Sequence, residues 1–419
     1  MVERHSLVVV GLGYVGLPLA VEAVRAGLTV HGLDKDQRRV DGLRAGRSHI
    51  DDVPDECVAL ALTQGFTPTT DLGCLRGADV VVICVPTPLD QSVPDLSAVR
   101  AAAAELTGRL RPGALVVLES TTYPGTTEEV LLPALEHDGR QVGRDFHLAF
   151  SPERIDPGNP EFSLRNTPKI VGGVTPECTA AAEAFYRRIV ERVVPVSTPA
   201  VAEMTKLLEN TYRQVNIALV NEMAVFCHEL KIVLWEAIDA AATKPFGFQA
   251  FRPGPGVGGH CIPIDPNYLS HRVRSLGYPF RFVELAQEIN SRMPTFVVDR
   301  VIRLLNEEGR SLRGARVLLL GVTYKADVAD ERESPSLAVA ERLQALGADV
   351  GYHDPYVPHW TIQGRALTRT PHLHDAVAQA DVTVLLQAHT TYDLDDLAAR
   401  SRLFFDTRGR TSGKNVVRL

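Results

Sequence analysis

Three glycines near the amino terminus constrain the fold more strongly than any other feature of the chain. Gly11, Gly13 and Gly16 form the pattern Gly-x-Gly-x-x-Gly, directly after the apolar run 7–10 and at the start of a helical pattern. In this context the glycines permit a tight turn and let the backbone approach a pyrophosphate, which then sits at the positive end of the helix. The sequence therefore predicts that the chain begins with a dinucleotide-binding unit.

An acidic residue at the end of the next expected strand indicates which dinucleotide binds. Asp34 follows the run 29–33 and can accept hydrogen bonds from the adenosine ribose hydroxyls, while its charge would repel a 2′-phosphate. We therefore expect NAD and not NADP. Arg38 and Arg39 stand where an arginine can serve NADP, but beside the acid we expect an arginine to cover the adenine or reach the phosphate.

Apolar runs alternate with helical patterns in the first and last parts of the chain. The expected strands are 7–10, 29–33, 79–85, 115–118, 147–150, 317–320, 349–353, 381–386 and 403–405. Continuous runs such as 80–83 are typical of parallel strands that are buried on both faces. Between the two parts, 201–230 has a long helical pattern without proline, about 45 Å at 1.5 Å per residue.

These patterns predict an α/β protein in which two doubly wound Rossmann-like domains are joined by a long central helix. We expect the domains to be 1–198, a central helical domain over 199–305, and 306–419. Asp354 ends a strand of the last domain as Asp34 does in the first, but the last domain has no full glycine pattern. We therefore do not expect it to bind a dinucleotide.

Charge and cysteine usage argue against several classes of protein. The formal charge is −7 with no long basic run, which gives no footprint for nucleic acid or an anionic membrane. No run of about 18 apolar residues indicates a membrane span. The six cysteines include no Cys-x-x-Cys pair and no metal-ligand spacing, which argues against a disulfide framework and a metal site. We expect a soluble cytoplasmic protein.

Residues 253–266, Pro-Gly-Pro-Gly-Val-Gly-Gly-His-Cys-Ile-Pro-Ile-Asp-Pro, are the most unusual segment. Four glycines and four prolines cannot form a regular element, so the backbone is shaped for close approach to something. Cys261 lies in this segment with Asp265 four residues on, a setting that favours a nucleophile over the usual inert buried thiol. We expect His260 to be structural, because adjacent side chains usually diverge.

Several motifs together resemble the UDP-glucose/GDP-mannose dehydrogenase family, in the right order over nearly the whole chain. They are the glycine fingerprint, Glu-Ser-Thr-Thr-Tyr-Pro-Gly-Thr at 119–126, Ser-Pro-Glu-Arg at 151–154, Lys206 with Asn210, the Gly-Gly-His-Cys loop, and Tyr-Lys-Ala-Asp at 324–327.

The resemblance implies a four-electron oxidation of a nucleotide sugar at C6, with two NAD consumed. Cys261 would trap the aldehyde and carry a thioester, and Asp265 would help activate water or the thiol. Lys206 and Asn210 would stabilise developing oxygen charge. Glu153 and Thr121 would position or deprotonate the hydrolytic water.

The resemblance also implies the binding contacts. Cofactor contacts are expected at Gly11, Gly13, Tyr14, Val15, Gly16, Asp34, Arg39, Val85, Pro86, Thr87, Ser120, Thr121 and Arg332. Substrate contacts are expected at Glu153, Arg154, Lys206, Asn210, Arg252, Gly256, Gly258, Tyr324, Lys325 and Arg408. The last domain would bind the UDP-sugar, and the central domain would form a homodimer or a larger oligomer. No metal is expected.

The loop around Cys261 departs from the commonest family pattern. His260 stands where Ser is common, and Ile264 where Lys is common. With 151–159 and 243–248, this resembles the UDP-N-acetylhexosamine branch. UDP-N-acetylglucosamine is the first choice, the mannosamine epimer second and UDP-glucose third, and the sequence does not separate these from the galactosamine epimer.

Two readings from other classes stay open. A hydroxyacid-type dehydrogenase would share the amino-terminal fold and need a single hydride transfer without a cysteine. A non-catalytic NAD-binding protein would bind the dinucleotide without turnover.

Overall fold

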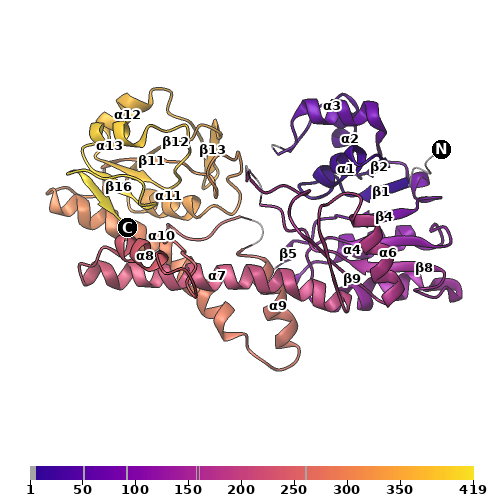
Figure 1. Ribbon diagram of the computed structural model, residues 1–419. Coiled ribbons are helices and arrows are strands. Elements are labelled where there is room, and N and C mark those ends of the chain that lie inside the picture. The colour runs from indigo at the N-terminus through magenta and orange to yellow at the C-terminus, as the bar shows by residue number, and fades with distance from the viewer. Residues whose placement is uncertain (1–5, 51, 91–92, 157, 160, 260–261) are drawn as a thin grey trace. The chain divides into compact units, whose positions relative to one another are not determined.

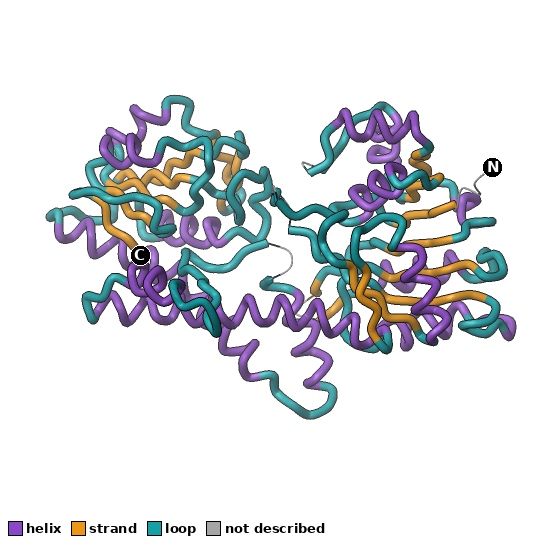
Figure 2. The backbone as a smooth tube through the Cα atoms, in the orientation of Figure 1, coloured by secondary structure: helices purple, strands orange, loops and turns teal. Residues whose placement is uncertain are grey.

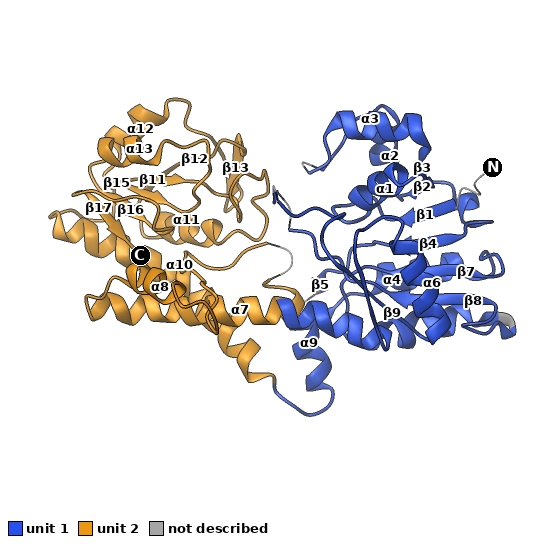
Figure 3. Ribbon diagram, viewed as in Figure 1, with its two compact units in different colours: residues 1–209, 267–279 blue, residues 210–266, 280–419 orange. Residues whose placement is uncertain are grey.

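The computed structural model describes residues 6–50, 52–90, 93–156, 158–159, 161–259 and 262–419 (Figure 1). The chain divides into two compact units, which Figure 3 shows in different colours. The first contains residues 1–209 and 267–279, and the second contains residues 210–266 and 280–419.

The first unit is built on an eight-stranded sheet in the order β10-β9-β8-β7-β4-β1-β2-β3. Its strands are β1 (Ser6–Val10), β2 (Thr29–Leu33), β3 (Phe66–Thr69), β4 (Val80–Ile83), β7 (Ala114–Leu118), β8 (Phe146–Phe150), β9 (Lys169–Gly173) and β10 (Val193–Val196). The helices include α1 (Gly16–Arg25), α2 (Gln37–Arg44), α3 (Asp55–Gln64), α4 (Ser97–Leu106), α5 (Leu132–Leu135) and α6 (Pro176–Tyr186).

One strand pair departs from the expected parallel sheet. β9 runs antiparallel to β8, with Phe150 opposite Gly172, whereas the other pairs in this sheet are parallel. Parallel neighbours need a crossover connection, usually a helix. No helix stands between β8 and β9 in the described residues of this connection, so the chain turns back along the same edge.

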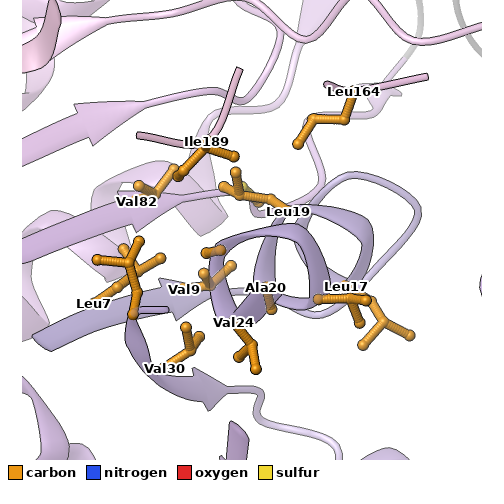
Figure 4. Packing of buried hydrophobic residues seen from close by; sticks show 14 of the residues in the cluster. Leu7, Val9, Leu17, Leu19, Ala20, Val24, Val30, Val82, Leu164 and Ile189 are labelled. Atoms are coloured by element: carbon orange, nitrogen blue, oxygen red, sulfur yellow. The ribbon is translucent and has the colours of Figure 1, made fainter. Parts of the chain in front are cut away.

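The core of the first unit fixes the glycine turn between β1 and α1. Leu7 and Val9 on β1 pack against Leu17, Ala20 and Val24 on α1, and all are buried (Figure 4). Because each fully buried aliphatic side chain contributes about 1.5–3 kcal/mol, this packing holds the turn rigidly over the end of β1.

The second unit repeats the architecture on a smaller scale. Its five-stranded parallel sheet has the order β12-β11-β15-β16-β17. The strands are β11 (Arg316–Leu320), β12 (Asp349–His353), β15 (Val382–Leu385), β16 (Phe404–Asp406) and β17 (Val416–Arg418). A hairpin of β13 (His359–Ile362) and β14 (Arg365–Thr368) is added, and a two-residue pair, β5 (Leu89–Asp90) with β6 (Val93–Pro94), belongs to the first unit.

Helices of the second unit are α8 (Leu234–Ala242), α10 (Arg281–Glu307), α11 (Pro335–Ala345), α12 (Leu373–Gln379) and α13 (Leu394–Arg400). Val297, Val301 and Leu305 of α10 are buried in one core with Val339 and Leu343 of α11. The sheet is thus held by the same helix-on-strand packing as the first.

The expected long central helix is confirmed as α7 (Pro199–Glu229), a continuous helix of 31 residues (Figure 2). Helix α9 (Asp265–Arg274) follows the glycine-rich segment. The two Rossmann-like sheets and the central helix confirm the predicted fold class, while the domain boundaries at 198/199 and 305/306 stay a proposal. No helix of the described residues is long and apolar enough to cross a membrane.

Candidate active site

The three fingerprint glycines differ in their surroundings. A Cβ on Gly11, which has φ +92°, would lie 2.6 Å from the carbonyl oxygen of Cys84, and one on Gly16 would lie 1.9 Å from that of Gly11. A Cβ on Gly13 would meet nothing within 4 Å. The first and third glycines therefore serve close backbone packing, and the second leaves the turn open to a ligand, as a bound pyrophosphate requires. Tyr14 is exposed beside it, and Val15 precedes α1.

Asp34 braces the glycine turn from the end of β2. Its Oδ2 accepts the N–H of Leu12 at 3.0 Å, and its Oδ1 accepts the N–H of Asp36 at 2.9 Å. Arg39 Nη1 lies 3.4 Å from Oδ2, with its side chain half exposed. The acid, its arginine and the open turn at Gly13 fit an NAD adenosine and pyrophosphate.

Replacing Asp34 by Asn tests the choice of cofactor. We expect the Kd of NAD to rise roughly tenfold, because a hydrogen bond to a charged group contributes about 1.5–3 kcal/mol. The Kd of NADP should rise less, because the charge that repels a 2′-phosphate is lost. Fluorescence titration of both dinucleotides measures this, with Asp41→Asn as the exposed control. Equal weakening of both would mean that Asp34 only braces the turn.

The ends of β4 and β7 bring together the residues expected beside the nicotinamide. Ser120 Oγ donates to the carbonyl of Val85 at 2.7 Å, and Tyr268 Oη donates to the carbonyl of Thr87. Pro86 is exposed between them, and Thr121 is half-buried. The segments 85–87 and 120–121 are therefore adjacent at the carboxyl edge of the sheet, where ligands bind in open α/β proteins.

Glu153 lies in a buried cluster of charges just beyond β8. Its Oε1 accepts the N–H groups of Arg154 and Ile155 at 2.6 and 2.7 Å, and its Oε2 lies 3.2 Å from Lys169 Nζ. Lys169 also lies 3.0 Å from Glu119 Oε1, which accepts the hydroxyl of Tyr186 as well. Two carboxyl groups thus share one buried ammonium.

The two carboxyls of this cluster titrate in opposite directions. Burial works to raise the pKa of Glu153, but Lys169, the backbone N–H of Ile155 and Lys206 together bring that pKa below its usual range. Burial raises the pKa of Glu119, and the charge of Glu153 adds to the rise against the attraction of Lys169. Glu153 is therefore the carboxyl that stays ionised.

The other expected residues of the first unit have structural partners. Arg154 binds Glu209 with two nitrogens, at 3.2 and 2.6 Å, and the carbonyl of Pro168 at 2.6 Å. Lys206 is buried on α7. One turn before it, Glu203 accepts the N–H groups of Gly125 and Thr127 at 2.5 and 2.9 Å and so fixes the loop after Thr121 to the helix.

In the second unit, Asn210 and Asp265 form one hydrogen-bonded pair. Asn210 Nδ2 donates to Asp265 Oδ2 at 2.5 Å. Asp265 is buried as the first residue of α9. The pair links α7 to the helix that follows the glycine-rich segment. Cys261 and His260 lie outside the described residues.

The glycine-rich segment before Cys261 is held by two buried amides. The N–H of Gly254 donates to Asn221 Oδ1 at 3.0 Å, and Asn221 Nδ2 donates to Asn290 Oδ1 at 2.9 Å. A Cβ on Gly256 would lie 2.9 Å from Pro335, and one on Gly258 would lie 2.5 Å from the carbonyl oxygen of Glu333. The segment therefore packs directly on the loop that contains the Tyr-Lys-Ala-Asp motif.

The residues expected to meet the nucleotide lie around this segment. Tyr324 lies beside Gly258: a Cβ added to Gly258 would be 2.9 Å from the Cβ of Tyr324. Arg408 lies beside Gly254: a Cβ added to Gly254 would be 3.1 Å from Arg408 Nη1. Burial lowers the pKa of Arg408 to about 10, so it stays protonated at neutral pH. Lys325 is half-buried next to Tyr324, and its carbonyl accepts the hydroxyl of Thr323 at 2.8 Å.

Two arginines expected at ligand contacts have carboxylate partners. Arg332 binds Asp330 through Nε at 2.8 Å, with its side chain half exposed. Arg252 binds Asp239 at 2.5 Å, and its guanidinium stacks 5.8 Å from the ring centroid of Trp235. Both side chains are about half exposed.

The second sheet repeats the acid of the first but encloses it. Asp354 Oδ2 accepts the N–H of Val322 at 2.7 Å, as Asp34 accepts that of Leu12. His389 Nε2, also buried, lies 2.9 Å from the same oxygen. Its Nδ1 accepts the N–H of Asp327 at 2.9 Å. Asp354 therefore holds the loop 324–327 through His389. A carboxylate enclosed in this way is not open to the ribose hydroxyls of a dinucleotide.

Several residues of the site were not assigned from the sequence. Lys169, Tyr186, Glu203, Asn221 and Asn290 are polar groups within buried surroundings, and only the three-dimensional contacts reveal them. Glu119 carried a detectable signal, because it directly follows a buried strand at the ligand-binding edge. Of the described residues, no group of three or more His, Cys, Asp or Glu could hold a metal ion.

Models of the UDP-glucose/GDP-mannose dehydrogenase family match three parts of the chain. The NAD-binding domain matches 5–190, the central domain 200–292 and the UDP-binding domain 318–413. An NDP-N-acetyl-D-galactosaminuronic acid dehydrogenase from Ralstonia nicotianae is 36% identical over 99% of this chain and 98% of its own. A UDP-N-acetyl-D-glucosamine 6-dehydrogenase from Pseudomonas aeruginosa is 37% identical over 84% of this chain and 83% of its own.

A solved structure shows the same fold throughout. The UDP-D-ManNAc dehydrogenase from Pyrococcus horikoshii has a TM-score of 0.89 and 33% identity, over 99% of this chain and 98% of that one. The dinucleotide turn and these matches define an NAD-dependent oxidoreductase. The chain belongs to the UDP-glucose/GDP-mannose dehydrogenase family.

Proposed function

We propose that this protein oxidises the C6 hydroxymethyl group of a UDP-N-acetylhexosamine to the carboxylate, with UDP-N-acetylglucosamine as the first choice of substrate. UDP-N-acetylmannosamine comes next and UDP-glucose third. Relatives of similar identity are named for the glucosamine, mannosamine and galactosaminuronic forms, and this supports the N-acetylhexosamine class more strongly than UDP-glucose.

The proposed chemistry places a thiol at the centre of the reaction. Bound NAD would accept hydride from the sugar C6 in each of two oxidations. Cys261 adds to the aldehyde as a thiolate, and the resulting thiohemiacetal is oxidised to a thioester. Lys206 and Asn210 donate to the oxygen that becomes negative. Asp265, buried and bonded to Asn210, fixes that amide and helps activate the thiol or water.

Hydrolysis of the thioester would use groups of the first unit. Glu153 accepts a proton from water while the water oxygen bonds to the carbonyl carbon, and Thr121 orients that water. The C–S bond then breaks and returns the thiolate. We assign the remaining cofactor contacts to the turn at 11–16, Asp34, Arg39, residues 85–87, Ser120 and Arg332. We assign the remaining substrate contacts to Arg154, Arg252, Gly256, Gly258, Tyr324, Lys325 and Arg408.

The observation that carries the proposal is the packing of the segment before Cys261. Gly258 lies against Tyr324 and the carbonyl of Glu333, and Gly254 lies beside Arg408. A nucleotide bound by Lys325 and Arg408 would therefore rest on the same folded unit that leads to the thiol. This arrangement supports a nucleotide-linked substrate rather than a small hydroxyacid.

A panel of UDP-sugars with NAD tests the substrate. We expect the kcat/KM of UDP-N-acetylglucosamine to exceed those of its mannosamine and galactosamine epimers and of UDP-glucose. Turnover of a different UDP-N-acetylhexosamine would correct the sugar alone. Turnover confined to small hydroxyacids, or NAD binding without turnover of any compound, would contradict the proposal.

We also propose that the protein is a homodimer formed through α7. This helix exposes the apolar side chains Val201, Met204, Leu208, Tyr212, Leu219, Val225 and Phe226. We expect sedimentation to give twice the 45.7 kDa chain mass, and Leu219→Glu to give monomers, because a buried charge disfavours association. Leu60→Glu, on the exposed side of α3, is the matched control. A monomeric parent protein would refute this assembly.

A further inference from the structure

Lys169 lies between two buried glutamates at the ligand-binding edge of the first sheet. Its Nζ lies 3.0 Å from Glu119 Oε1 and 3.2 Å from Glu153 Oε2. The side chains of Lys169 and Glu119 are 4% and 0% exposed. Because a buried ion without a partner costs several kcal/mol, each charge in this cluster requires another to balance it.

The hydrogen bonds of the two glutamates are unequal. Glu153 has both oxygens engaged with donors, the N–H groups of Arg154 and Ile155 on Oε1 and Lys169 on Oε2. Glu119 Oε1 receives Lys169 and the Tyr186 hydroxyl, while its Oε2 has no hydrogen-bond partner among the described residues. Hydrogen bonds donated to a carboxylate favour its ionised form, so Glu153, which has donors on both oxygens, is better suited to be charged, and Glu119, which has none from the described residues on Oε2, to carry a proton.

The surrounding charges lead to the same distribution. The titratable groups around the cluster are Lys169 on β9, Glu119 after β7, Lys206 on α7, Tyr186 on α6 and Cys84 after β4. Burial raises the pKa of Cys84 and of Tyr186, so both stay neutral. The second cation, Lys206, lowers the pKa of Glu153 and is not among the main causes of the shift at Glu119, so it also favours Glu153 as the ionised carboxyl.

We propose that Lys169 and Glu119 are positioning residues for thioester hydrolysis: Lys169 keeps Glu153 ionised and aimed, and Glu119 stays neutral so that it does not compete for Lys169. This inference rests on the proposed function, since it gives Glu153 the hydrolytic water. In that step a water O–H bond breaks toward Glu153, a C–O bond forms and the C–S bond breaks. The proton on Glu153 then passes to the departing thiolate.

The pH dependence of a single turnover tests this assignment. The rate of UDP-uronate release should fall at acid pH as Glu153 is protonated. A nearby opposite charge lowers a carboxyl pKa by about 1–3 units, so the double variant Lys169→Met/Glu119→Gln should shift this acid limb upward by that amount. Glu119→Gln alone, which mimics the neutral acid, should keep the parent profile. Lys169→Arg should restore most of the parent profile in place of Met.

A merely structural role for Lys169 would lower the amount of folded protein without moving the acid limb. An unmoved limb in the folded double variant overturns the proposal, and so does a profile shifted by Glu119→Gln alone. Glu191→Gln is the exposed control.

Infrared difference spectroscopy gives a readout that needs no turnover. At neutral pH the C=O band of a protonated carboxyl should be present in the parent protein, absent in Glu119→Gln and kept in Glu191→Gln. If no UDP-sugar is turned over, the proposed function fails while this band still tests the cluster. If turnover yields uronate but the band is absent, only the present inference fails.

Discussion

Cys261→Ser will lose steady-state turnover by roughly 10³-fold or more, while the Kd of NAD stays unchanged. The reason is chemical: a thiolate forms at accessible pH and leaves readily from a thioester, whereas serine does neither, and removing a catalytic nucleophile costs losses of this order or larger. Initial rates of NADH formation with saturating UDP-sugar measure the effect.

Cys74→Ser is the matched control, since Cys74 is a partly buried thiol in the short 3-10 helix Leu72–Leu75. It should retain parental rates. If Cys261→Ser also turned over at the parental rate, the covalent mechanism would be removed, and a reaction without a protein-bound intermediate would replace it.

The largest expected effect on stability is that of Lys169→Met. It leaves Glu119 and Glu153 buried without their shared cation, and breaking a buried ion pair by removing one partner costs about 3–5 kcal/mol. For a unit of this size the Tm should fall by roughly 10 °C. Differential scanning calorimetry measures it, with Lys244→Met on an exposed loop as control.

The pH dependence of the stability lost in Lys169→Met follows from the pKa values of the two glutamates. Glu119 is neutral with or without Lys169. Without Lys169, burial raises the folded pKa of Glu153 above that in the unfolded chain, so the variant's deficit is greatest at neutral pH and shrinks as pH falls. Adding Glu153→Gln should recover part of the lost Tm, whereas adding Glu119→Gln, which replaces an acid that is already neutral, should not. A deficit that is independent of pH and of Glu153 would point to lost packing and not to unpaired charge.

The sequence was sufficient to predict the elements with strong local signals. The strands at 29–33 and 349–353 coincide with β2 and β12, and the long proline-free pattern became α7. Each is specified by its own residues, through apolar continuity or helical periodicity. β9 (Lys169–Gly173) was not predicted as a strand from the sequence. Its antiparallel direction depends on how the chain returns after β8 and not on its own composition.

The same distinction applies to the residues of the candidate site: local spacing predicts some of them, and others depend on contacts with distant parts of the chain. Gly11, Gly16 and Asp34 could be assigned because local spacing determines what they do, and the structure gives them close backbone packing and two N–H contacts. Lys169 and Asn221 could not, since each acts on residues far along the chain, Glu119 in one case and Gly254 in the other. A buried lysine opening a strand looks like any strand residue until its partners are in place.

The central claim is that one thiol carries the sugar through two oxidations. The most direct test is the ratio of NADH formed to UDP-sugar consumed, measured at completion with limiting UDP-sugar and excess NAD. A thioester route requires two NADH for each UDP-uronate, with no free aldehyde. A ratio of one, with aldehyde or ketone as the final product, would contradict it.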